Sequence, residues 1–219
     1  LAPLILTSAV LPLQTIVTLL LARSSLASAS AWVAGMMVVR LLQGVLFGLV
    51  LAPIEEQSEA GTQYFVGGLL LVLALVLFVK ALRTATGAED EDAPPPKWVT
   101  KASAMTPGVA FGYGAGLMTI SVKFLVFTLG AIAVIAEAHI YRSVGLGRSV
   151  LTFVLFVLLA HSIPLALLGL AASPSPRAAG ILDGVSAWLK RNNRAITLVF
   201  SVIFGVWFLI KAADRLGIF

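Results

Sequence analysis

Six long apolar segments constrain this chain more than any other feature of its sequence. They lie at about residues 3–22, 32–52, 64–82, 109–136, 150–170 and 195–210. An α-helix needs about 20 predominantly apolar residues to cross the hydrocarbon core of a bilayer. Each segment is apolar along its length rather than on one face, which is typical of a spanning helix. The sequence therefore predicts an all-α integral membrane protein with six transmembrane helices.

The composition excludes the main classes of soluble protein. Of the 219 residues, 59% are hydrophobic and 11% are charged, whereas soluble domains are about 45–50% apolar and about 25% charged. Basic loops on the cytoplasmic side explain the net charge of +5, so we expect membrane lipids and no nucleic acid as partners. The chain contains no cysteine, which excludes disulfides and thiolate metal sites, and we expect no cofactor.

The distribution of basic residues orients the predicted helices. If the segment between the first two helices lies inside, nine of the fifteen Lys and Arg lie inside, four lie outside and two lie within helices. Because Lys and Arg are enriched in cytoplasmic loops, we expect a multi-pass plasma-membrane protein with both termini outside. The first segment could instead be a signal peptide followed by Ala27-Ser28-Ala29, but no basic residue precedes it, as a signal peptide requires.

A polar linker divides the chain into two halves. Residues 1–86 and 107–219 each hold three predicted helices, and residues 87–106 join them on the cytoplasmic side. The linker contains the acidic, proline-rich stretch Ala88–Pro96, which indicates a solvated connection, with partner binding as the alternative. Further along, Arg177–Arg194 mixes apolar and basic residues and fits a short interfacial helix.

The two halves resemble each other in sequence. Arg40–Leu49 in the second helix matches His161–Leu170 in the fifth, since both begin on a basic-type side chain and end in Gly-Leu. Phe78–Ala81 likewise matches Leu209–Ala212, at the ends of the third and sixth helices. Three helices per copy is an odd number, so the second copy enters the membrane from the opposite side. The pattern predicts two inverted three-helix repeats, as in many secondary transporters, with the binding site near the midplane.

Four polar side chains lie near the centres of their predicted spans: Gln14, Arg40, Lys123 and His161. A charge at the bilayer centre costs about 2.5–3.5 kcal/mol on insertion scales, and such residues usually face a cavity or a partner. No carboxylate lies at the centre of a span, so Arg40 and Lys123 lack counterions that a ligand could supply. This favours an anionic substrate and argues against a metal-cation exporter, which needs oxygen ligands. Snorkelling or an interhelix hydrogen bond is the alternative explanation.

Three further polar residues complete the predicted substrate site with Arg40, Lys123 and Gln14. They are Gln43, Thr119 and Ser121. His161 is the candidate for proton coupling, because small changes in the surroundings of an imidazole change its protonation.

Helix breakers surround these positions and predict hinges. Pro12 and Pro164 each remove a backbone hydrogen bond, and Gly112, Gly114 and Gly116 loosen the start of the fourth helix. Broken helices at membrane depth expose backbone N–H groups that can hold anions. Kinks that serve packing are the alternative, since Gly and Pro are frequent in membrane helices. The Gly-x-x-x-Gly spacing at 44–48 and 112–116 fits close helix packing and leaves a homodimer open.

Several short motifs carry a family resemblance. Ser8-Ala9-Val10-Leu11-Pro12 precedes the apolar run Ile16–Leu21, Ala34-Gly35 opens the second helix, and Lys123 lies in a Gly-rich fourth helix. With these motifs the chain resembles the lysine-exporter superfamily and, within it, the sulfolipid-addressing or glycopeptidolipid-addressing family. The superfamily often carries Asn-Pro-Lys in helix four, and Ser121-Val122-Lys123 keeps only the lysine. The resemblance implies a six-helix export protein with inverted repeats and a link to the movement of envelope glycolipids.

Together, the observations predict a secondary transporter or exporter of an anionic or amphiphilic solute, such as an envelope lipid or its precursor, working by alternating access. A non-transporting scaffold or accessory subunit of a lipid-export machine is the main alternative, favoured by the acidic linker. An intramembrane enzyme is the third. It has little support, because the chain has two histidines, no cysteine and no central acid, and His161 and Ser162 would point about 100° apart on a helix.

Overall fold

The protein is helical throughout the part of the chain that the structure describes. The computed structural model describes residues 1–9, 12–57, 59–87, 101–137, 146–173 and 175–218, so the acidic stretch at 88–96 lies outside the described residues. The helices are α1 (Ala2–Ala9), α2 (Pro12–Ser24), α3 (Leu26–Gln57), α4 (Glu59–Ala85), the 3-10 turn η1 (Ala102–Ala104), α6 (Pro107–Ile120), α7 (Val122–Glu137), α9 (Leu146–Ala160), α10 (Ser162–Ala171) and α11 (Pro176–Arg215).

Three helical stretches are each long and apolar enough to cross a bilayer: Leu26–Gly48, Gly67–Ala85 and Arg191–Arg215. A fourth is added if the bent pair Gly147–Ala160 and Ser162–Ala171 counts as one span. These stretches coincide with the second, third, sixth and fifth predicted segments. The prediction of an all-helical membrane protein is confirmed, and the described residues provide three to four of the six predicted spans by this criterion.

Three of the six predicted segments are broken near their middle. The first is divided between α1 and α2, and the fourth between α6 and α7, where the backbone of Ser121 is extended (φ −78°, ψ 109°). The fifth is bent by 56° between α9 and α10, with His161 at the bend. Pro164 explains this bend, because it has no amide hydrogen for the carbonyl of Ala160. Pro12 deprives the carbonyl of Ser8 of its partner in the same way.

The break in the fourth segment does not fall at the glycines that were expected to loosen it. Gly112, Gly114 and Gly116 all lie inside the continuous helix α6, which ends at Ile120. Tertiary packing accounts for this continuity, because α6 is pressed against α3 along one side. A side-chain carbon on Gly114 would lie 2.3 Å from the carbonyl oxygen of Trp32.

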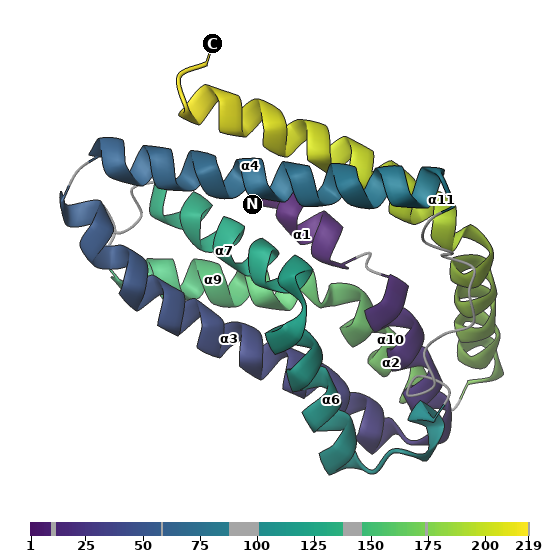
Figure 1. Ribbon diagram of the computed structural model, residues 1–219. Coiled ribbons are helices and arrows are strands. Elements are labelled where there is room, and N and C mark those ends of the chain that lie inside the picture. Colours follow the sequence, from purple (N-terminus) through teal and green to yellow (C-terminus); the bar gives the residue numbers. More distant parts are fainter. Residues whose placement is uncertain (10–11, 58, 88–100, 138–145, 174, 219) are drawn as a thin grey trace.

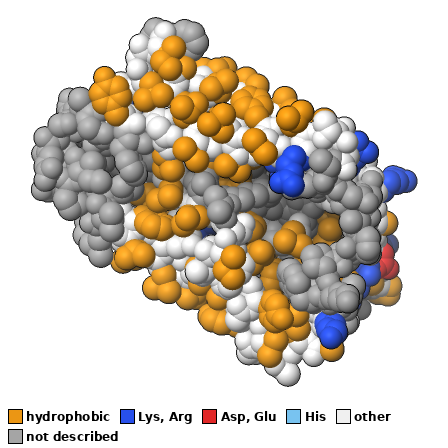
Figure 2. Space-filling model, viewed as in Figure 1, with side chains coloured by type: hydrophobic (Ala, Val, Ile, Leu, Met, Phe, Trp, Pro, Cys, Tyr) orange, Lys and Arg blue, Asp and Glu red, His pale blue; other side chains and the backbone are white. Residues whose placement is uncertain are grey.

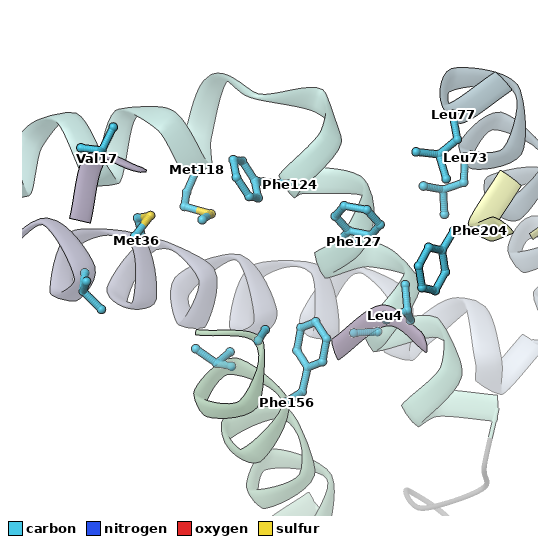
Figure 3. Packing of buried hydrophobic residues seen from close by; sticks show 14 of the residues in the cluster. Leu4, Val17, Met36, Leu73, Leu77, Met118, Phe124, Phe127, Phe156 and Phe204 are labelled. Atoms are coloured by element: carbon cyan, nitrogen blue, oxygen red, sulfur yellow. The ribbon is translucent and has the colours of Figure 1, made fainter. Parts of the chain in front are cut away.

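The α3–α6 contact brings two backbones together. A side-chain carbon on Gly35 would lie 2.3 Å from the carbonyl oxygen of Phe111, so glycine permits an approach that any other residue prevents. Met36 and Met118 point toward each other across this contact, as Figure 3 shows, and both are fully buried. The two helices run in the same direction, as the second and fourth of six alternating spans would.

The helices α4 and α11 lie side by side and run antiparallel (Figure 1). A side-chain carbon on Gly67, near the start of α4, would lie 3.0 Å from Leu216, just past the end of α11. Further along, Phe78 packs against Gly205. The segment Arg177–Arg194, predicted as a short interfacial helix, is joined without a break to the last span. Together they form the 40 residues of α11, about 60 Å long against a hydrocarbon core of about 30 Å.

Basic side chains gather at one end of the molecule. Figure 2 shows apolar side chains over most of the described surface on this face, with Lys and Arg concentrated toward the end where α4 ends and α11 begins. Exposed arginines there include Arg23 at the end of α2, Arg83 near the end of α4 and Arg177 at the start of α11. This asymmetry fits the one that orients membrane proteins.

Candidate functional site

Arg40 lies near the middle of the unbroken helix α3, and its side chain is completely buried. Nη2 donates a hydrogen bond to Oγ of Ser8 on α1 over 2.8 Å, and Nε donates to Oγ1 of Thr128 on α7 over 3.3 Å. The guanidinium carbon lies 5.3 Å from the ring centroid of Phe156 and 6.0 Å from that of Phe124. Both distances are within the range of cation–π attraction. Hydroxyls and aromatic rings therefore surround the charge.

Among the described residues, no carboxylate pairs with Arg40. The described ion pairs, Arg23–Asp183 and Lys211–Asp214, join exposed or half-exposed side chains. A hydrogen bond to a charged group contributes about 1.5–3 kcal/mol, which is comparable with the cost of about 2.5–3.5 kcal/mol for a charge at the bilayer centre. The two hydroxyls thus make the buried charge tolerable without neutralising it, and the site keeps a net positive charge.

Gln43, almost one turn after Arg40, connects this charge to the break in the fourth segment. Its Nε2 donates to the carbonyl of Met118 over 3.0 Å. In a continuous helix that carbonyl would bond to the amide four residues later, but α6 ends at Ile120, so the Gln43 amide takes its place. The hydroxyl of Thr128 lies 3.3 Å from Oε1 of Gln43. The side chain of Gln43 thus bonds to a free carbonyl at the end of α6 and to the hydroxyl that accepts from Arg40.

Gln14 plays the same part at the break in the first segment. Its Nε2 donates to the carbonyl of Ser8 and, over 3.4 Å, to that of Ala9. In a continuous helix the carbonyl of Ser8 would accept from the amide of residue 12, but Pro12 has no amide hydrogen to donate. The side chain of Gln14, which is fully buried, therefore replaces a missing backbone donor in the protein interior.

His161 lies at the third break, where its ring contacts a carbonyl that also accepts the backbone amide of the same residue. Its side chain is buried, and Nδ1 lies 2.8 Å from the carbonyl of Val157, one turn earlier in α9. A carbonyl only accepts hydrogen bonds, so Nδ1 carries the hydrogen and Nε2 of the neutral ring is an acceptor. The guanidinium of Arg40 lies against the ring of Phe156, the residue before Val157. Each of the three breaks thus has a polar side chain bonded to a carbonyl of its last turn.

Three buried polar atoms in this cluster have no partner within the described part of the chain. They are Nη1 of Arg40, Oε1 of Gln14 and Nε2 of His161. About nine in ten buried polar groups in proteins are hydrogen-bonded, and each exception calls for an explanation such as a water or an ion. We call Ser8, Gln14, Arg40, Gln43, Thr128 and His161 the Arg40 cluster. Its free donor and fixed positive charge suit an anionic group.

The structure brings together four of the predicted site residues: Gln14, Arg40, Gln43 and His161. Thr119 lies apart, because it is exposed and its hydroxyl donates to the carbonyl of Ala115 in its own helix over 2.9 Å. Ser121 is half-buried at the break itself. Lys123 is the second residue of α7, and its side chain lies outside the described residues.

Sequence reasoning missed two members of the cluster, Ser8 and Thr128. Both are small hydroxyl residues, which membrane helices carry often, so their residue type gave little signal. A positional signal for Ser8 was available, because it lies four residues before Pro12 and its carbonyl must find another donor. No comparable signal marked Thr128. Its role arises from the packing of α7 against α3.

An apolar groove of about 560 Å³ runs along the side of α6 that faces away from α3 and ends at the break. A side-chain carbon on Gly112 or Gly116 would meet no atom within 4 Å, so these glycines form the floor of an open surface. From Val109 to Ser121 the groove extends about 18 Å at 1.5 Å per residue, slightly more than half of the roughly 30 Å hydrocarbon core. The residues that line it are Val109, Gly112, Tyr113, Gly116, Leu117, Ile120 and Ser121.

Comparison with protein families gives a match over almost the whole chain. The model of the family described as Sap, sulfolipid-1-addressing protein, matches residues 1–214. The chain belongs to this family. No curated protein matches the chain, and no solved structure matches it either. Membership confirms the suspected sulfolipid-addressing family and indicates a membrane protein involved in lipid export.

Proposed function

We propose that this protein is a secondary-type exporter of an amphiphile with an anionic headgroup, such as an envelope lipid or its precursor, and that it works by alternating access. One observation carries the proposal: Arg40 is fully buried, has no described carboxylate partner and keeps one nitrogen without a hydrogen bond. An enzyme is not needed to explain this arrangement, since the cluster presents binding groups rather than a nucleophile with its base.

The headgroup would bind at the free Nη1 of Arg40 and compete for the nitrogens that now donate to Ser8 and Thr128. Arginine presents its donors in a planar fork that matches sulfate, phosphate or carboxylate oxygens. The first half of the chain supplies Ser8 and the second half supplies Thr128, so an anion that competes for the fork would loosen the connection between the halves. Lys123, at the start of α7, is a second cation that we propose for the same site.

The apolar part of the amphiphile would lie in the groove on α6. Its volume is within the range of about 300–1,000 Å³ that ligand pockets have, and its length is close to the depth of one leaflet. The groove ends at Ser121, where the chain breaks toward the buried cluster. A headgroup at the cluster and an acyl chain in the groove would together account for both features.

We further propose six spans arranged as two inverted repeats. Two relations in the structure support this. The third and sixth segments, α4 and α11, pack antiparallel, as two copies related by an axis in the membrane plane would. The first and fourth segments also break at corresponding places. If Gln14 and Lys123, the central polar residues of these two segments, are aligned with each other, the start of α2 falls within one residue of the start of α7. The three breaks would serve as hinges around the cluster.

Substitution of Arg40 tests the headgroup site. The protein is reconstituted in nanodiscs of mixed anionic phosphatidylglycerol and zwitterionic phosphatidylcholine, and the retained lipids are identified by native mass spectrometry. We expect the wild type to retain anionic lipid and Arg40→Leu to retain at least about tenfold less, a loss of about 1.4 kcal/mol. Leucine has no charge to desolvate, which offsets the loss of the hydrogen bonds to Ser8 and Thr128, so the fold should be retained. Arg148→Leu, on the exposed part of α9, is the matched control.

Equal anionic lipid in Arg40→Leu and the wild type would contradict the headgroup site and favour the non-transporting scaffold. The acidic linker at 88–96 could then be deleted to ask whether a partner is lost.

Filling the groove tests the acyl-chain site separately. Gly112→Leu and Gly116→Leu add side chains where the structure has space, so the fold should be retained. We expect less cross-linking to a lipid that carries a photoreactive group on its acyl chain, while Gly169→Leu, at an equally open glycine on α10, should cross-link normally. Unchanged cross-linking would exclude the groove as the acyl-chain site. Conversion of a dimer to a monomer by Gly112→Leu would show that a second copy occupies it.

A further inference from the structure

His161 is a buried titratable group that the proposed headgroup site does not yet use. Its Nδ1 is committed to the carbonyl of Val157 over 2.8 Å, so only Nε2 can gain or lose a proton while the ring keeps this bond. Nε2 is buried and has no partner among the described residues. A proton added there would need a hydrogen-bond acceptor that the described cluster does not offer at that atom.

A proton on this ring would add a second positive charge to the cluster that already holds Arg40. The guanidinium of Arg40 lies against the ring of Phe156, and Nδ1 of His161 is bonded to the carbonyl of the next residue, Val157. Both side chains are completely buried, so little solvent screens one from the other. A second positive charge in the same buried cluster is therefore unfavourable as long as no negative charge accompanies it.

An anion at the free nitrogen of Arg40 would remove this opposition. It would neutralise the guanidinium, and its oxygens could accept a hydrogen bond from a protonated Nε2 as well as from Nη1. We propose that the Arg40 cluster takes up an anion and a proton together, with the proton moving from solvent to Nε2 of His161 when an anion pairs with Arg40. This inference rests on the proposed headgroup site and adds proton coupling to it.

Apart from Arg40 and His161, no described titratable side chain is buried. Of the helices packed against α9 and α10, α1 has no titratable side chain and α2 contributes Arg23, which pairs with Asp183 of α11 near the basic end of the molecule. Arg148 of α9 is exposed, and so are the described charged side chains of α11 except Arg215, which is half-buried. The side chains of Glu55 and Glu56 on α3 and of Lys190 on α11 lie outside the described residues. On α7, the side chains of Lys123 and Glu137 lie outside the described residues.

Thermodynamic linkage makes the proposal measurable. If the anion favours the proton, the proton favours the anion by the same factor, which for linked sites is typically about 5–150-fold. Inorganic sulfate is the appropriate probe, because it stays fully ionised between about pH 5 and pH 8, the range in which histidine commonly titrates. Any dependence of its affinity on pH must then come from the protein.

The experiment measures sulfate binding to the full chain in detergent by isothermal titration calorimetry. Bis-Tris and imidazole are suitable buffers, because neither is an anion and their ionisation enthalpies differ. We expect the affinity to rise as the pH falls, by at most about tenfold per pH unit for one proton. The apparent enthalpy should differ between the two buffers, in the sense of proton uptake on binding. His161→Gln should bind sulfate with an affinity that does not change with pH, whereas His139→Gln, at the other histidine of the chain, should behave like the wild type.

The outcomes separate this inference from the proposal on which it rests. Sulfate binding by the wild type that is independent of pH and of buffer would overturn proton coupling and leave the anion site intact, and this comparison needs no variant. Unchanged pH dependence in His161→Gln would also overturn it. Absence of sulfate binding at every pH would contradict the anion site and the coupling together.

Discussion

Two regions of α3 lie less than two turns apart but make different kinds of contact. Around Gly35, α3 meets α6 backbone to backbone, and packing alone holds the contact. Around Arg40, the same helix carries a buried charge that donates to hydroxyls on two other helices, and one guanidinium nitrogen has no described partner. The first region is a close packing contact between two backbones, whereas the second contains three buried polar atoms of one cluster that the described chain does not satisfy. Natural proteins depart from complete satisfaction mainly at functional sites, so the difference identifies which part of α3 holds the fold and which part binds.

The largest expected effect sharpens the packed side of this comparison. Gly114→Val places a carbon 2.3 Å from the carbonyl oxygen of Trp32, and backbone atoms cannot move aside as a flexible side chain can. We expect a loss of about 3 kcal/mol or more, seen as a lower thermal midpoint and loss of the monodisperse peak on size exclusion. Gly116→Val, on the open side of the same helix, should fold normally. Equal losses of stability in both variants would contradict this role of the α3–α6 contact, since valine is no worse than glycine as a helix former.

A middle-sized effect tests whether Gln14 replaces the donor that Pro12 lacks. Gln14→Leu leaves the carbonyl of Ser8 without its side-chain donor, and an unsatisfied buried group costs about 1–3 kcal/mol. Pro12→Ala restores a backbone amide, so Gln14→Leu should cost clearly less in that background. Chemical unfolding of the two single variants and the double variant in micelles measures this coupling. Strictly additive losses would remove Gln14 from its role at the break.

The smallest effect concerns a charge at the rim, in contrast to the charge in the interior. Arg23 and Asp183 form an ion pair with side chains 42% and 69% exposed, and such surface pairs contribute about 0.2–1 kcal/mol. Arg23→Gln should therefore lower unfolding stability only slightly, and by less at high salt. A loss above about 2 kcal/mol, or one that salt does not reduce, would show that this pair fixes α11 against α2 more firmly than its exposure indicates.

The sequence predicted the helical fold and the central residues of the site because both depend on local chemistry. Apolar runs of bilayer length leave few alternatives to helices, and a basic residue at mid-span is conspicuous among apolar neighbours. Arg40, Gln14, Gln43 and His161 were found in this way, and the structure places them in one cluster. Thr119 was expected beside them from its residue type, but a helix gives each position a direction, and Thr119 is exposed.

Sequence by itself determined that this chain is a membrane-embedded helical protein with an unpaired cation at its centre, since composition and hydropathy act residue by residue. Only the tertiary structure decided where the helices break, which glycines are packed and which are open, and which carbonyls need a side-chain donor. Those outcomes depend on contacts between residues far apart in the chain. Gln43 illustrates the difference, because its amide became a partner of Met118 only when α6 ended early and came to lie against α3.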